Sequence, residues 1–190
     1  MQSHHISRIA REFLGIAIKN DSLLKRVNNT GIFFMPEIAF AYECGIFIAM
    51  NKSGMIESNE HHWLREKNLG LGPIDCLFLS EDKKGQSLVI EFKMDDTIQA
   101  YAKDIEKLHK LNSADHSFIK LFCSLKHLFK GQEEKYIEQM KTTFPEPIKL
   151  IKSEVFRTNN GVPEKDICLY TLWAVDPPEE LAFFLEPNLD

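Results

Sequence analysis

Apolar residues recur at helical spacing in the first part of the chain. From Ile6 to Val27 they fall at intervals of three or four positions, which predicts a helix, and polar residues 20–22 predict a break within it. Pro36 is a favoured first-turn residue, and we expect a second helix from there to about Asn51. This second segment is apolar nearly all round, so it should be packed on most sides.

Shorter apolar runs replace the helical spacing after Gly54. We expect a strand around residues 62–65, a second over 74–79 and a third over 87–94. A short polar loop joins the last two of these segments, so they should pair antiparallel as a hairpin.

The second half of the chain alternates between helical and extended patterns. Residues 97–111 have an apolar stripe and a charged face, which is typical of an amphipathic helix. A strand over 117–125, a helix over 132–143 and two strands over 148–156 and 168–175 should follow. The resulting order predicts an α/β fold with a mixed central β-sheet flanked by helices, and not a doubly wound repeat.

Composition is that of an ordinary globular chain. Its 190 residues suit a single domain, with 44% hydrophobic and 27% charged residues. No apolar run reaches the roughly 18 residues that cross a bilayer, and the first residues lack the order of a signal peptide. We therefore expect a full-length cytoplasmic protein without a membrane partner. The net charge of −5 disfavours nucleic-acid binding through overall charge but leaves room for a local basic groove.

The cysteines and histidines do not form a metal motif. None of the four cysteines, at positions 44, 76, 123 and 168, is spaced as CxxC, and all have apolar neighbours, which favours buried free thiols. The histidines also lack the spacing of zinc ligands.

Three charged residues stand inside apolar strand segments. In the 87–94 strand Glu91 and Lys93 are two positions apart, so both side chains should point to the same face. Asp75 interrupts the preceding apolar run, and the hairpin can bring it beside Glu91. Two adjacent carboxylates repel unless a cation lies between them, and a hard divalent cation prefers oxygen ligands. This pattern indicates a metal-assisted site.

The same residues resemble the motif of the PD-(D/E)xK superfamily, which includes restriction endonucleases and repair nucleases. Asp75 matches the Asp of that motif, and Glu91-Phe92-Lys93 matches its Glu-x-Lys on the neighbouring strand. The sequence departs from the motif at Ile74, because its proline, Pro73, stands one position earlier. The resemblance covers roughly residues 36–125.

The resemblance implies a restriction-endonuclease-like core of αβββαβ order within the 1–190 domain, with an additional N-terminal helix and C-terminal strands. It implies a nuclease acting on DNA, in which Asp75, Glu91 and the Phe92 carbonyl hold Mg²⁺ (or Mn²⁺). Lys93 would position water or stabilise charge on the phosphate, and Glu37 on the preceding helix would assist catalysis. A homodimer is possible by the same analogy, although no segment marks an interface.

The same residues also allow simpler interpretations that involve no catalysis. The charged cluster could be a structural set of salt bridges, and Glu37 could only stabilise the start of its helix. Tyr101 lies on the apolar stripe of its helix, so core packing explains it better than a contact with DNA. Lys103, Lys107 and Lys110 on that helix could face phosphates, but solvated charge is the default. Alternative functions are an inactive nuclease-fold binding or regulatory module, with an apolar tail at 181–185, and a metal-dependent hydrolase of RNA or another phosphoester.

Overall fold

A computed structural model describes residues 3–52, 56, 60–82, 85–112, 117–144, 147–159 and 167–179. The helices are α1 (Ser3–Asn28), the short 3-10 helix η1 (Ile32–Phe34), α2 (Glu37–Met50), α3 (Ile98–Lys110) and α4 (Glu133–Thr143). The strands are β1 (His61–Asn68), β2 (Pro73–Ser80), β3 (Gln86–Met94), β4 (Ser117–Leu128), β5 (Ile148–Arg157) and β6 (Ile167–Val175). Each helix and strand that the sequence predicts is present, with boundaries that differ by a few residues.

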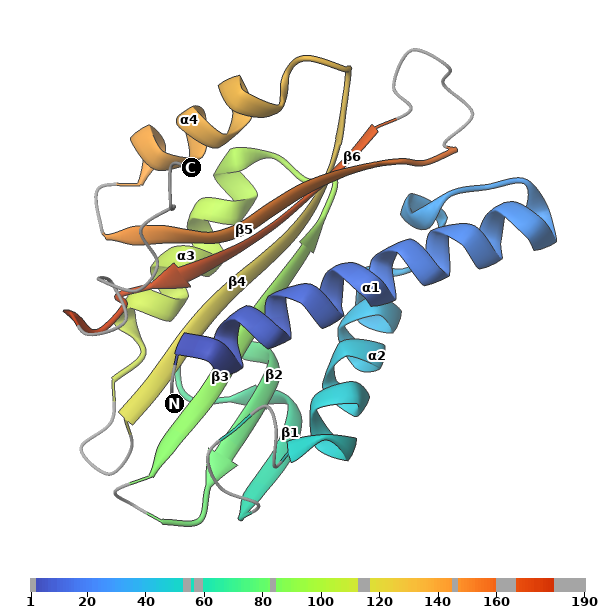
Figure 1. The fold of residues 1–190 in the computed structure, drawn as a ribbon. Coiled ribbons are helices and arrows are strands. Elements are labelled where there is room, and N and C mark those ends of the chain that lie inside the picture. The colour runs from blue at the N-terminus through green and yellow to red at the C-terminus, as the bar shows by residue number, and fades with distance from the viewer. Residues whose placement is uncertain are drawn as a thin grey trace.

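The six strands form one mixed sheet in the order β1-β2-β3-β4-β6-β5. β3 and β4 run parallel, and every other neighbouring pair is antiparallel. A parallel pair needs a long crossover connection, and α3 provides it between β3 and β4 (Figure 1). The predicted antiparallel pairing of the 74–79 and 87–94 segments is confirmed by β2 and β3.

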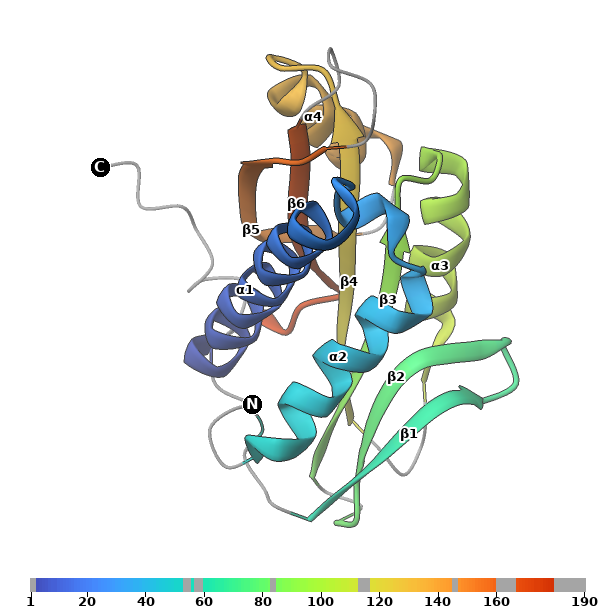
Figure 2. The same ribbon diagram turned by 90° about the vertical axis from the view of Figure 1, so that its right-hand side faces the viewer.

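Helices cover both faces of the sheet. α1 and α2 lie together on one face, and α3 lies on the other (Figure 2). The two faces have separate apolar cores, and α4 contributes to the core that α3 covers. Alternation along β3 explains the division, because Leu88, Ile90 and Phe92 pack in the α1–α2 core while Val89 packs in the α3–α4 core. The prediction of a mixed α/β sheet flanked by helices is therefore confirmed.

One prediction about α1 is wrong. The helix continues without a break through residues 20–22. Asn20 and Asp21 are buried, and both use their side chains to contact other elements. Asn20 donates to Glu43 on α2 at 2.7 Å, while Asp21 accepts from the backbone N–H of Ile32 at 2.9 Å. Polar residues within this helix thus connect it to its neighbours and do not end it.

The cysteines and the helices also bear on what the sequence predicts about burial and membranes. All four cysteines are free and buried, as their apolar neighbours predicted. Within the described part of the chain, no helix has both the length and the apolar character that crossing a bilayer requires. The apolar segment at 181–185 lies outside the described residues.

Gly45 marks a close contact between α2 and β1. A Cβ atom built on Gly45 would lie 2.7 Å from Cε2 of Trp63, well inside van der Waals contact. The indole cannot retreat easily, because it stacks on Phe78 with ring centroids 6.1 Å apart and donates to the Cys76 sulfur at 3.2 Å. Glycine in a helix interior is normally unfavourable. Here it permits α2 to approach the strand.

We expect Gly45→Ala to lower the free energy of unfolding by about 1–3 kcal/mol, because overpacking of Trp63 outweighs the gain in helix propensity. Gly15→Ala in α1 is the matched control, since a Cβ there meets nothing within 4 Å. That variant should be more stable than wild type by about 0.5–1 kcal/mol. Urea unfolding of both variants measures the difference. Equal stabilisation by both substitutions would contradict the proposed contact.

Candidate functional site

The hairpin of β2 and β3 opens at the position of Asp75. The pairing register between the two strands extends to Cys76 and Ile90 and stops there. Beyond this point the Asp75 carboxylate, through Oδ2, accepts the backbone N–H of Phe92 at 2.8 Å. The N–H and C=O of one strand residue point to the same side, so the Phe92 carbonyl also faces the opening beside Asp75.

Glu37 occupies the next position along the same edge. Its Oε2 accepts the backbone N–H of Met94 at 2.8 Å, and its Oε1 lies 3.2 Å from the Lys93 ammonium. Glu37 is the first residue of α2, where the helix N-terminus also favours a carboxylate. It therefore lies at the helix start and in the charged cluster at once, and its assistance to catalysis stays a prediction.

Glu91 lies deeper than the other charged groups. Its side chain is 2% exposed, and its Oε1 lies 2.7 Å from the ammonium of Lys107 on α3. Lys107 also donates to the backbone carbonyl of Pro73 at 2.8 Å, so it bridges the strands on either side of the opening. A buried carboxylate requires such a partner, because an unpaired charge is expensive to remove from water.

Asp104 joins the two lysines. Its Oδ2 lies 3.1 Å from the Lys93 ammonium, and its Oδ1 lies 3.5 Å from the Lys107 ammonium. The charges therefore alternate along one connected chain, in the order Glu37, Lys93, Asp104, Lys107, Glu91. α2, β3 and α3 each contribute to this chain.

The structure brings together all five predicted site residues, Glu37, Asp75, Glu91, Phe92 and Lys93, and adds Asp104 and Lys107 on α3. Asp104 was not predicted as a site residue, and Lys107 was expected to be solvated by default, with a position facing phosphates as the alternative. A signal was present, because Asp104 is three residues after Tyr101 and four before Leu108, on the apolar stripe of α3. Tyr101 itself is fully buried against Phe122, which confirms its assignment to the core.

Burial and neighbouring charges shift the proton equilibria of this cluster. Burial raises the pKa of Glu91 to about 9; the charge of Asp75 adds to the rise, and Lys107 opposes it. Burial also raises the pKa of Glu37, against the influence of Lys93. Burial alone would lower the pKa of Lys93, but Glu37 and Asp104 outweigh it and raise that pKa above its ordinary value. Lys93 is therefore a permanent cation and not a proton acceptor at neutral pH.

The cluster has the donors and the charge that suit a divalent cation. Four carboxylates and two ammonium groups leave a net charge of −2 when all are ionised. Asp75 and the Phe92 carbonyl offer hard oxygen atoms where the β2–β3 pairing ends, and the buried Glu91 carboxylate lies near them in contact with Lys107. Among the described residues, no group of three or more His, Cys, Asp and Glu side chains is arranged to hold a metal. Mg²⁺, however, is commonly held by one or two carboxylates with water and substrate phosphate.

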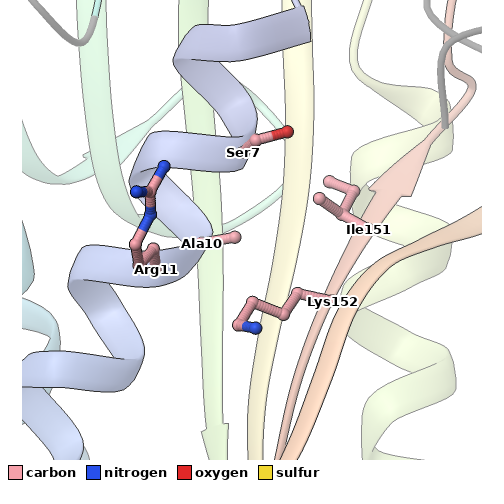
Figure 3. Close-up of a pocket in the computed structure, with 5 residues that line it drawn as sticks. All are labelled: Ser7, Ala10, Arg11, Ile151 and Lys152. Carbon is pink, nitrogen blue, oxygen red and sulfur yellow. The ribbon is translucent and has the colours of Figure 1, made fainter.

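Two hollows lie away from this cluster. One, of about 270 Å³, lies between α1 and β5 and is lined by Ser7, Ala10, Arg11, Ile151 and Lys152 (Figure 3). The other, of about 310 Å³, lies between α3 and the end of α4 and includes His109 and Phe144. Neither shares a lining residue with the charged cluster, so the opening between β2 and β3 remains the candidate site.

The comparisons with known proteins leave the family open. No protein-family model matches the chain, and neither a curated protein nor a solved structure matches it.

The raised pKa of Glu91 predicts a pH-dependent stability. A carboxyl group whose pKa is higher in the folded state stabilises the fold below its unfolded pKa of about 4.5, and this stabilisation is lost as pH rises through about 9. Glu91→Gln cannot titrate. It should therefore gain stability over wild type as pH increases from 5 to 9, by an amount on the order of 1–3 kcal/mol.

Thermal or urea unfolding in chelator-containing buffer at several pH values measures this difference. Glu138→Gln is the control, because Glu138 is an exposed carboxylate on α4. If the difference in unfolding free energy between Glu91→Gln and wild type does not change with pH, the pKa of Glu91 is not raised in the folded protein.

Proposed function

We propose that this chain is a Mg²⁺-dependent nuclease that hydrolyses DNA phosphodiester bonds, built on a restriction-endonuclease-like core. One observation carries the proposal: the charge of Asp75 acts on Glu91 where the β2–β3 pairing ends, and Asp104 connects Lys107, the partner of Glu91, to the Lys93 ammonium. An acidic pair next to a fixed cation suits a phosphodiester, because the reaction needs a metal ligand set and a positive group near the phosphate.

The topology supports the same proposal. Residues 36–125 contain α2, β1, β2, β3, α3 and the larger part of β4, in the αβββαβ order that the resemblance implies. The acidic residue and the Glu-x-Lys stand on the two strands of an antiparallel hairpin, and β4 runs parallel to β3 on its other side.

Each side chain would have a distinct role. Asp75, Glu91 and the Phe92 carbonyl would hold the divalent ion, which supplies Lewis acidity and an activated water when it is bound. Lys93, held between Glu37 and Asp104, would stabilise negative charge on the phosphate. The raised pKa of Lys93 favours this role over proton transfer. Glu37 would act through Lys93, as a residue that positions it.

A second candidate is a non-catalytic binding or regulatory module on the same fold. The observation that favours it is the closed set of contacts, because Glu91 is already paired with Lys107 and Asp75 with a backbone N–H. In that case the ion pairs would be structural. The two candidates differ in whether the carboxylates bind a metal.

Asp75→Asn/Glu91→Gln should abolish Mn²⁺ binding and Mg²⁺-dependent cleavage while the fold is retained, because both charged metal ligands become neutral amides. Calorimetric titration with Mn²⁺ measures the first effect. Incubation with plasmid, single-stranded DNA and RNA measures the second, and the expected loss of cleavage is at least a hundredfold. The matched control is Glu134→Gln/Glu138→Gln, two exposed carboxylates on α4.

Cleavage that survives in the Asp75/Glu91 double variant would rule out this site as the catalytic centre. Wild type that binds no Mn²⁺ with DNA present or absent, and cleaves none of the substrates, would support the binding module. Cleavage confined to RNA would keep the site and change the substrate.

A further inference from the structure

Lys107 is placed as a counterion and not as a solvated helix residue. Its side chain is 15% exposed, although lysine on a helix surface is usually solvated. The ammonium lies 2.7 Å from Glu91 Oε1 and 2.8 Å from the Pro73 carbonyl, between the two strands that carry the candidate metal ligands. A positive charge at this point compensates the same carboxylate that a divalent cation would use.

We propose that Lys107 is a resident cation that a divalent metal ion displaces from Glu91, and that the released ammonium then binds a phosphate of the nucleic acid. This inference rests on the proposed function, and it assigns to the site a second phosphate-binding lysine and a coupling between metal and substrate. The family motif contains neither Lys107 nor Asp104.

Asp104 determines where Lys107 goes after it leaves Glu91. One oxygen of Asp104 lies 3.5 Å from Lys107 and the other lies 3.1 Å from Lys93. Lys107 therefore retains a nearby anion when Glu91 turns to another cation. The two ammonium groups stay on either side of one carboxylate, which suits the separate oxygens of a phosphodiester or two neighbouring phosphates.

The electrostatics give the sign of the expected effect. The Lys107 ammonium lies 2.7 Å from Glu91 Oε1, so it repels a divalent ion that approaches the same carboxylate, and Coulomb energy is proportional to charge. Removing the ammonium removes this repulsion, so metal binding becomes tighter.

Lys107→Met should therefore bind Mn²⁺ about three to ten times more tightly than wild type, and DNA about ten times more weakly. Calorimetry measures the first quantity, and fluorescence anisotropy with labelled DNA in Ca²⁺ measures the second. Lys103→Met is the matched control, because Lys103 is an exposed lysine on the same helix and forms no ion pair with any residue that the structure describes. Lys107→Arg retains the charge and should not tighten Mn²⁺ binding.

A second measurement uses the wild-type protein and does not depend on the folding of a variant. Acetylation of lysines by a water-soluble reagent, followed by mass spectrometry, reports how accessible each ammonium is. Saturating Mg²⁺ should increase the modification rate of Lys107 several-fold and leave Lys103 unchanged. DNA added in Ca²⁺ should protect Lys107 again.

The failures are distinguishable. The proposed function and this inference would both be overturned if wild type binds no Mn²⁺. They would also be overturned if the Asp75→Asn/Glu91→Gln variant binds Mn²⁺ as well as wild type does. A different result would overturn only the role of Lys107. In that case Mn²⁺ binding would require Asp75 and Glu91 but would be equally strong in Lys107→Met and Lys103→Met. Metal would also leave the acetylation of Lys107 unchanged. Stronger metal binding without weaker DNA binding would overturn the phosphate contact.

Discussion

The end of the β2–β3 ladder is the constraint on which the charged cluster depends. β3 continues beyond its last partner in β2, and the N–H groups of Phe92 and Met94 then need other acceptors. Buried backbone donors are almost always paired, and here two carboxylates take the place of a neighbouring strand. Asp75 comes from β2 itself and Glu37 from the start of α2. The need to pair these backbone N–H groups thus places two acidic side chains along the end of β3.

The grouped carboxylates in turn require positively charged partners. Carboxylates this close together repel one another, and Glu91 is nearly fully buried. The structure places one lysine from β3 and one from α3 among them, and Asp104 separates the two lysines. Because the contributing elements are a strand in the middle of the sheet and helices on both faces, neither lysine can change position without breaking an ion pair.

The sequence predicts local features of this arrangement well. Alternation on one strand placed Glu91 and Lys93 on the same face, and both do contact α3. The sequence could not show that Lys107 reaches across to Glu91, because that contact depends on how α3 crosses the sheet. The error in α1 has a similar origin: Asp21 is polar, yet its partner Ile32 is supplied by tertiary structure.

Stability alone is a poor explanation for a cluster of this kind. Buried ion pairs rarely stabilise a fold more than apolar side chains of similar size, because desolvation offsets their attraction. Both faces of the sheet already have extensive apolar cores, so the fold does not need these charges to hold the strands together. The charged groups of this cluster lie where the β2–β3 pairing ends, and the Phe92 carbonyl faces the same side. This position favours the proposal that a charged ligand binds where β2 and β3 separate and replaces part of the internal compensation. A phosphodiester accompanied by a divalent cation carries both signs of charge that such an exchange requires.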